Sequence, residues 1–132
     1  MSALTVYVVG VGARRGASAA EVGALVDSAL AEARISPDAV AHLATVDTKG
    51  YEEGIRTVAA DRGWRVVTWP AARLAQVLVP TPSALVGEVA GTSSVAEAAA
   101  MLDAVGRQTG TLVVEKRRSA VATVAVAAHR SS

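Results

Sequence analysis

The stretch Leu4-Thr-Val-Tyr-Val-Val-Gly-Val-Gly-Ala-Arg-Arg-Gly-Ala-Ser18 decides the fold class of this chain. Its first part, Leu4 to Gly10, is an apolar, β-branched run bounded by glycine, which predicts a strand buried on both faces. Ser18 and Glu21 follow at the spacing of a capping box, and they predict a helix that ends near Arg34. A buried strand that leads through a glycine-rich loop into a helix is typical of α/β proteins.

The alternation of strands and helices continues along the rest of the chain. Strands are predicted at residues 40–46, 64–68, 111–115 and 120–128, and the last two are joined as a hairpin through the charged residues 116–119. Helices or helical turns are predicted at residues 36–38, 53–62, 70–76, 83–91 and 94–105, and residues 130–132 are expected to form a frayed tail. Gly63 is expected to end the helix at 53–62, and Ser94 and Glu97 have the capping-box spacing at the start of the helix at 94–105. We therefore predict a single domain over residues 1–132, an α/β/α three-layer sandwich around a mixed, mostly parallel sheet.

The composition excludes several classes of protein. Hydrophobic residues make up 52% of the 132 residues and aromatic residues only 3%, so the core must consist mainly of Val, Leu and Ala. The absence of Cys rules out disulfides, thiolate metal sites and a cysteine nucleophile, and it fits a reducing compartment. The net charge of +1 predicts no general attraction to nucleic acid or to membranes. The first apolar run is too short for a signal peptide or a membrane span, so we expect a soluble, cytoplasmic protein.

The glycine-rich loop after the first strand is the best candidate for a binding site. A loop of this kind at a helix N-terminus offers free backbone amides and a positive dipole end to an anion. Arg14 and Arg15 add two guanidinium groups, each able to grip a carboxylate or phosphate through two hydrogen bonds. The spacing of Gly10, Gly12 and Gly16 does not match the dinucleotide-binding fingerprint. The alternative is that the glycines only permit a tight turn and the arginines are solvated.

A second candidate group follows the strand at 40–46, where open α/β sheets place their ligands. Asp47, Lys49 and Glu52 could perform acid–base work or bind a polar ligand. Alternatively, Asp47 caps a turn and Lys49 pairs with Glu52 on the surface.

Two weaker candidates lie further along the chain. The small residues from Gly91 and Thr92 onward precede a predicted helix and could bind an anion through their amides, or could simply begin the helix. Lys116 is the member of the charged hairpin segment expected to point inward. Neither His42 nor His129 has an acidic or histidine neighbour at metal-ligand spacing, so we expect no metal and no cofactor.

An ordered set of motifs resembles the family of CobE and the C-terminal domain of CbiG. The motifs are Val9-Gly-Val-Gly-Ala-Arg-Arg-Gly-Ala-Ser18, Val46-Asp-Thr-Lys-Gly-Tyr-Glu52, Val79-Pro-Thr-Pro-Ser83, Val89-Ala-Gly-Thr-Ser-Ser-Val-Ala-Glu97, Leu112 to Lys116 and Ala122-Thr-Val-Ala-Val126. They span nearly the whole chain. The resemblance implies an α/β/α three-layer fold and a role in building the corrin ring of cobalamin.

The resemblance also has departures, and it suggests a set of site residues. Ala13 stands where the family often has Cys, and Tyr51 stands where it usually has an acidic residue, which weakens a catalytic interpretation of the second motif. The matched positions form a candidate substrate-binding site made of Gly10, Gly12, Arg14, Arg15, Gly16, Ser18, Asp47, Lys49, Glu52, Gly91, Thr92 and Lys116. No catalytic residue is assigned.

These observations lead to one favoured hypothesis and two alternatives. Corrin precursors carry acetate and propionate side chains, which arginine, lysine and backbone amides would bind. The favoured hypothesis is a carrier or protective protein for such an anionic tetrapyrrole. The first alternative is a small hydrolase acting on a precorrin lactone, as the resemblance to CbiG suggests. The second is a module that docks onto another enzyme of cobalamin biosynthesis. No nucleic-acid or membrane partner is expected.

Overall fold

A computed structural model describes residues 4–50, 52–78 and 92–131. Five strands, four α-helices and two short 3-10 helices are assigned in these ranges. They are β1 (Leu4–Ala13), α1 (Ala19–Glu32), η1 (Pro37–Ala39), β2 (Val40–Val46), η2 (Asp47–Lys49), α2 (Glu53–Arg62), β3 (Arg65–Trp69), α3 (Ala71–Ala75), α4 (Thr92–Met101), β4 (Thr111–Arg118) and β5 (Ala122–Ser131). The predicted helix at 83–91 lies outside the described residues.

The strands form one mixed sheet in the order β3-β2-β1-β5-β4. β1, β2 and β3 are parallel, and β5 is antiparallel to both β1 and β4. β4 therefore points in the same direction as β1, β2 and β3, and only β5 among the described strands points the other way. The predicted mixed, mostly parallel sheet is confirmed.

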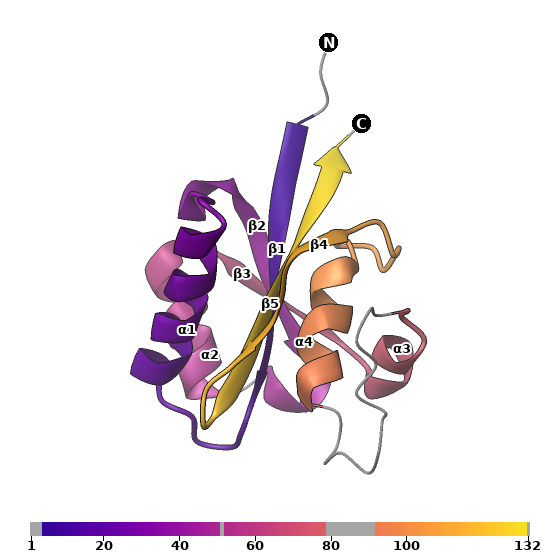
Figure 1. The fold of residues 1–132 in the computed structure, drawn as a ribbon. Helices are drawn as coiled ribbons and strands as arrows, with labels where there is room; N and C mark the ends of the chain where they lie inside the picture. The colour runs from indigo at the N-terminus through magenta and orange to yellow at the C-terminus, as the bar shows by residue number, and fades with distance from the viewer. Residues whose placement is uncertain (1–3, 51, 79–91, 132) are drawn as a thin grey trace.

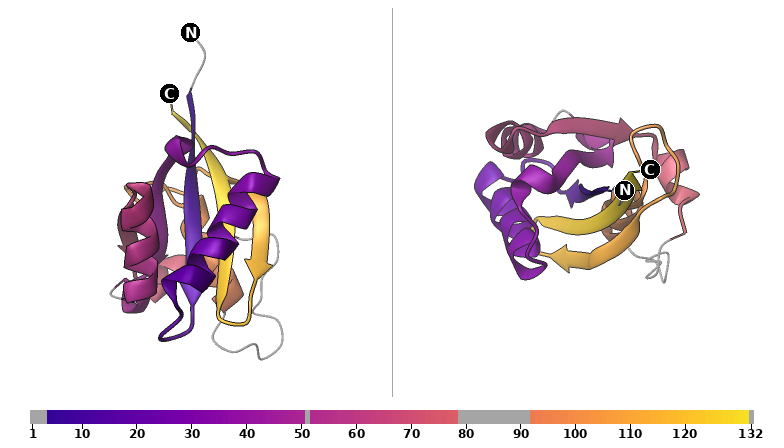
Figure 2. Two further views of the ribbon diagram at one scale, coloured as in Figure 1. Left: turned by 90° about the vertical axis from the view of Figure 1, so that its left-hand side faces the viewer. Right: turned by 90° about the horizontal axis from the view of Figure 1, so that it is seen from above.

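The helices cover the sheet on both faces, as Figure 1 shows with α1 and α2 on one side and α3 and α4 on the other. The view from above in Figure 2 shows the same three layers. Alternate residues of β1 pack against the two helix layers in turn, because successive side chains of a strand point to opposite faces of the sheet. Val9 and Val11 pack with α1 and α2, whereas Val8 packs with α3 and α4.

The α4 helix lies unusually close to the sheet. A Cβ atom on Gly10 would be 2.0 Å from the carbonyl oxygen of Ala96 and 2.8 Å from the amide nitrogen of Ala100. Ala125 and Ala127 of β5 form the adjoining surface beneath α4. Small residues on both sides thus allow the helix backbone to rest on the strands.

Three sequence predictions need correction at their ends. The predicted first strand stops at Gly10, but β1 continues to Ala13 because it pairs with β5 along its whole length. Helix α4 ends at Met101 instead of Val105, because Asp103 accepts hydrogen bonds from the amides of Val105 and Arg107 in a tight turn. The predicted frayed tail is wrong for Arg130 and Ser131, because β5 continues to Ser131, which pairs with Leu4 of β1.

The hairpin is also shorter at its tip than the sequence predicts. Lys116, Arg117 and Arg118 belong to β4, and the turn lies at residues 119–121. The Ser119 hydroxyl accepts hydrogen bonds from the amides of Val121 and Ala122, which closes the turn. The charged side chains therefore belong to a strand, and their direction is set by the pairing of β4 with β5.

The close approach of α4 to Gly10 predicts a large effect of adding one methyl group. Gly10→Ala forces the α4 backbone off the sheet, and we expect it to lower the free energy of unfolding by about 2 to 3 kcal/mol. Urea denaturation followed by circular dichroism measures this change. The control is Gly63→Asn, because Gly63 has a positive φ with nothing within 4 Å of its virtual Cβ. Asparagine tolerates this conformation, so the control should lose less than about 1 kcal/mol. Equal losses in the two variants would contradict the steric argument.

Candidate functional site

The carboxyl ends of four strands lie along one edge of the sheet. β1 ends at Ala13, β2 at Val46, β3 at Trp69 and β4 at Arg118, and these four strands run in the same direction. This edge is at the bottom of Figure 1. Open α/β sheets bind ligands at this edge, and the predicted site motifs follow these strands.

The loop between β1 and α1 is a short, defined turn. The amide of Ala17 donates to the carbonyl of Arg14 at 3.1 Å, and Gly16 has a φ of +79°. The Ser18 hydroxyl accepts from the amide of Glu21 at 3.1 Å and donates to its carboxylate at 3.0 Å. The predicted N-cap is therefore confirmed, and Arg14 and Gly16 are exposed on the turn.

This loop is bonded to the segments on both sides of it. The amide of Gly16 donates to Glu52 Oε1 at 2.9 Å, which joins the first and second motifs. The amide of Arg14 donates to the carbonyl of Val121 at 2.8 Å, which joins the loop to the hairpin turn. Glu52 therefore helps to hold the loop in place, and the structure does not show the predicted alternative pairing of Glu52 with Lys49.

Gly54 is a residue of this region that the sequence analysis missed. A Cβ atom at this position would lie 2.2 Å from the carbonyl oxygen of Ala17, so the first turn of α2 is in backbone contact with the end of the loop. The available signal was a glycine in the first turn of a predicted helix, where glycine lowers helix stability. Such a glycine often marks a close contact with another part of the chain.

Two adjoining hollows open along α2, and the smaller of them borders the loop. The smaller, about 380 Å³, is lined by Gly16, Ser18 and Glu52 from the predicted site and by the first turn of α2. The larger, about 680 Å³, lies between α2 and β3 and includes Asp47. Thr57 lines both hollows. Four of the predicted site residues therefore border one continuous surface.

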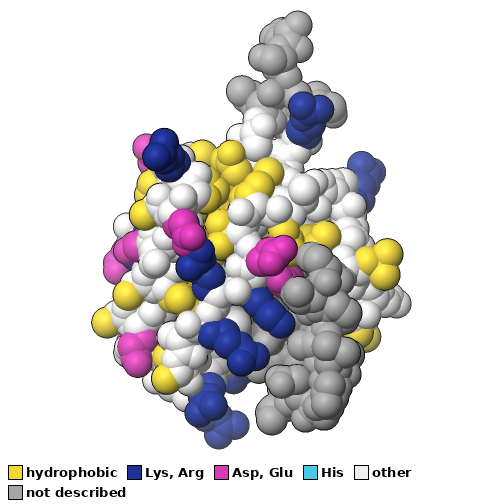
Figure 3. All heavy atoms as spheres, in the orientation of Figure 1, with side chains coloured by type: hydrophobic (Ala, Val, Ile, Leu, Met, Phe, Trp, Pro, Cys, Tyr) yellow, Lys and Arg dark blue, Asp and Glu magenta, His cyan; other side chains and the backbone are white. Residues whose placement is uncertain are grey.

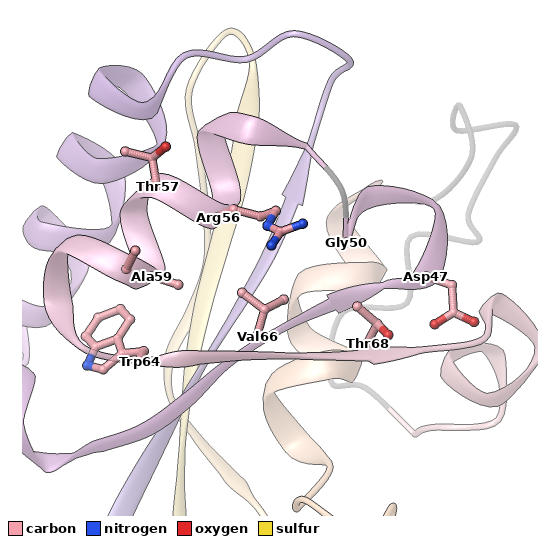
Figure 4. A pocket seen from close by; sticks show the side chains of 9 residues that line it. Asp47, Gly50, Arg56, Thr57, Ala59, Trp64, Val66 and Thr68 are labelled. Carbon is pink, nitrogen blue, oxygen red and sulfur yellow. The ribbon is translucent and has the colours of Figure 1, made fainter.

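Figure 4 shows how the larger hollow is built. Trp64, Ala59 and Val66 supply an apolar floor, and Asp47 and Thr68 lie at the opposite end.

The guanidinium group of Arg56 extends over this hollow (Figure 4), and Arg56 is exposed. Arg56 was not among the predicted site residues, because one arginine within an amphipathic helix is not distinctive. The hollow can accept an apolar surface that carries an acidic group.

Positive side chains also gather along β4. Lys116 and Arg117 are partly buried, Arg118 is exposed, and all three line a hollow of about 860 Å³ between α1 and β4. In Figure 3, Lys and Arg side chains are concentrated on the lower part of the visible face, toward the carboxyl edge. We call Arg14, Arg15, Lys116, Arg117 and Arg118 the basic strip.

The remaining predicted site residues are placed differently. Gly10 and Gly12 lie inside β1, and Gly10 makes room for α4. Lys49 is partly buried in η2 and lines neither hollow. Thr92 is the first residue of α4, and Gly91 lies outside the described residues.

The groups with shifted pKa values lie away from this edge, toward the opposite end of the strands. Burial, with the positive charge of Arg65 nearby, lowers the pKa of His42 to about 4. Burial alone would raise the pKa of Asp103, but hydrogen bonds from the amides of Arg107 and Val105 hold it below its ordinary value. Within the described ranges, no group of three His, Asp or Glu side chains could hold a metal ion.

Comparisons with known proteins agree on one family. A profile described as "Cobalamin synthesis G C-terminus" matches residues 7–127. The chain is 35% identical over 122 residues to a cobalt-precorrin-5A hydrolase of Priestia megaterium, covering 92% of this chain and 32% of that protein. It is 35% identical over 122 residues to the protein CobE of a Sinorhizobium species, covering 91% of this chain and 78% of that protein. The chain thus spans about a third of the hydrolase and most of CobE.

A solved structure gives the same result for the fold. The crystal structure of CobE, a protein from the cobalamin biosynthetic pathway, superimposes with a TM-score of 0.77 and 33% identity. The match covers 94% of this chain and 93% of that chain.

The bond between Gly16 and Glu52 predicts a specific effect on the loop. Glu52→Ala removes the acceptor, so we expect hydrogen exchange at the Gly16 amide to rise about tenfold and the free energy of unfolding to fall by about 1 kcal/mol. NMR-detected exchange and urea denaturation measure the two effects. Glu53→Ala is the control, because Glu53 is an exposed neighbour with the same charge. An unchanged exchange rate at Gly16 in Glu52→Ala would contradict this role.

The low pKa of His42 predicts a loss of stability in acid. The unfolded chain takes up a proton at His42 below about pH 6.5, but the folded chain does so only near pH 4. Above pH 6.5 His42 is neutral in both states and does not lower the stability of the fold. As the pH falls from 6.5 to about 4, the free energy of unfolding decreases by up to about 3 kcal/mol, because only the unfolded chain takes up the proton. Urea denaturation at several pH values measures this slope. His42→Leu should flatten it, because His42 Nε2 is buried and has no hydrogen-bond partner among the described residues. An unchanged slope in His42→Leu would refute the assignment.

Proposed function

Because this chain belongs to the family of cobalamin synthesis G C-terminal domains, we propose that it binds an anionic corrin-ring precursor and carries or protects it. Family membership makes it a cobalamin biosynthesis protein of the CobE and CbiG type. The main support for binding is the loop at the carboxyl edge. It is fixed by hydrogen bonds to Glu52 and Val121 and carries the exposed Arg14 and Arg15.

The chemistry of this edge suits a ligand with several carboxylates. Arg14 and Arg15 can each form paired hydrogen bonds with a carboxylate. Their backbone is held in place, so binding would order only the side chains, which limits the entropy lost on binding. The acetate and propionate groups of a corrin precursor extend from the rim of its ring, so several cations can engage them at once.

The ring itself needs an apolar surface. The hollow between α2 and β3 offers Trp64, Val66 and Ala59, with Arg56 above them. Its volume of about 680 Å³ is in the range of small-molecule sites. A corrin precursor is wider than this hollow, so we propose that one side of the ring is accommodated there and the rest stays open to solvent or to another protein.

We also propose that the protein works in the cytoplasm, alongside the enzymes of the pathway. The lack of Cys is compatible with this compartment. In the part of the chain that the structure describes, no helix has the length and hydropathy needed to cross a membrane.

A second candidate function is hydrolysis of a precorrin lactone. The observation in its favour is the 35% identity to a cobalt-precorrin-5A hydrolase, which covers about a third of that protein. Asp47 is exposed at the edge of the larger hollow and could act as a general base. Glu52 is less suited to this role, because one of its oxygens accepts the Gly16 amide.

The test is a titration of purified protein with isolated corrin-pathway intermediates, followed by visible absorption. Saturable binding without a change of pigment is expected for a carrier, whereas spectral conversion with turnover would establish the hydrolase instead. Absence of binding by a folded protein would reject both proposals and favour a module that docks onto another pathway enzyme.

Charge reversal tests the site within the same assay. Arg14→Glu with Arg15→Glu should weaken binding at least 100-fold, because two charge-assisted contacts become repulsive. The matched control is Arg65→Glu with Arg130→Glu. Both arginines are exposed and lie near the opposite end of the sheet, where Arg65 is beside His42 of β2 and Arg130 is beside Thr5 of β1 in the strand register. The control changes the net charge equally and should bind within about threefold of the wild type. Equal affinities in the two double variants would remove the loop from the site.

A further inference from the structure

Strand β4 contains an extra residue near the basic strip. Val114 pairs with Val126 and Arg117 pairs with Val124, so three steps along β4 match two steps along β5. This β-bulge changes the direction of the side chains that follow it. Val114 is buried against α1 and α2, and Arg117 lies on the same face, where it forms an ion pair with Glu32 of α1. A regular strand would place Arg117 on the opposite face.

A buried carboxylate contacts this bulge. Glu97 is 0% exposed and lies on α4 among alanines that are also 0% exposed. Its Oε2 accepts a hydrogen bond from the amide of Lys116 at 3.1 Å. Lys116 is one of the two residues between the paired positions of the bulge, where the regular ladder is interrupted. Glu97 therefore provides an acceptor for a backbone amide of β4 at the point where the pairing of β4 with β5 is irregular.

Burial of a carboxylate is costly, so its position requires a reason. An ionised group in a protein interior costs several kcal/mol unless hydrogen bonds compensate for the lost water. From its spacing to Ser94, Glu97 is predicted to be the last residue of a helix-capping pattern. In the structure α4 begins at Thr92, and the carboxylate is directed to β4.

We propose that Glu97 is a positioning residue for the anion site: it holds the β4 bulge through the Lys116 amide and so sets the direction of the Lys116 side chain. The inference rests on the proposed binding of a polycarboxylate ligand. Helix α4 can act in this way because it is held against Gly10 of β1, the strand that leads into Arg14. Helix α4 thus contacts both strands that carry the basic strip: β1, which leads into Arg14 and Arg15, and β4, which contains residues 116–118.

The experiment compares two substitutions that separate the reach of the side chain from its charge. Glu97→Asp keeps the charge but is one methylene shorter, so it cannot reach the Lys116 amide from the same backbone position. Glu97→Gln keeps the reach and an acceptor oxygen. The probe is uroporphyrin, a cyclic tetrapyrrole with acetate and propionate side chains, titrated by absorption at constant ionic strength. We expect binding about tenfold weaker for Glu97→Asp and within about threefold of the wild type for Glu97→Gln.

A double-mutant cycle with Lys116→Ala distinguishes positioning from a general effect on folding. Lys116→Ala keeps the backbone amide and removes the cation. If Glu97 acts by placing this cation, Glu97→Asp should have little further effect on affinity in the Lys116→Ala background. Additive losses would overturn the proposal, and so would an unchanged affinity in Glu97→Asp.

A measurement on the wild type covers the case in which Glu97→Asp does not fold. The Lys116 amide should exchange at least 100-fold more slowly than an unprotected amide, because it is hydrogen-bonded to a buried carboxylate. Rapid exchange would overturn the proposal without any variant. If the wild type itself does not bind uroporphyrin or the pathway intermediates, the proposed function fails, whereas a wild type that binds with additive losses in the cycle refutes only the role of Glu97.

Discussion

The contact between the backbone of α4 and Gly10 of β1 is the constraint on which the rest of the structure depends. It requires a residue without a side chain on β1 and small residues on α4, and Ala96, Ala98, Ala99 and Ala100 are all fully buried. Helix α4 is then close enough to the sheet for the Glu97 side chain to reach the backbone amide of Lys116 in β4. The same contact fixes the direction of β1 just before its chain becomes the exposed loop at the carboxyl edge.

The parts of the fold that depend on neighbouring residues could be predicted from the sequence. β2 and α2 have the predicted bounds, and Gly63 ends α2 with a left-handed conformation, as expected. The Ser18 cap is also formed. In these cases the strand pattern or helix signal lies within a few residues of the feature that it determines. The overall fold class follows from the order of such segments.

The errors concern residues whose role is set by partners far away in the sequence. Gly10 was interpreted as part of a loop, but its role is to admit a helix that begins 82 residues later, at Thr92. Glu97 was interpreted as a cap, but it bonds to a strand. Asp103 ends α4 through bonds to its own turn, which the helical pattern of alanines does not reveal. A glycine or an acidic residue in the sequence does not show which element it will contact.

The candidate site combines a rigid backbone with exposed cations, and this combination has a consequence for binding. Gly54 packs against Ala17, and Gly16 is bonded to Glu52, so the loop cannot change shape without breaking backbone contacts. The guanidinium groups of Arg14 and Arg15 are at the surface, where their long side chains can take several directions. Such an arrangement fixes where a carboxylate binds only approximately, and it suits a ligand whose several acidic groups are spaced around a ring. A site built to break one bond requires closer control of position, so the architecture of this edge favours binding over catalysis.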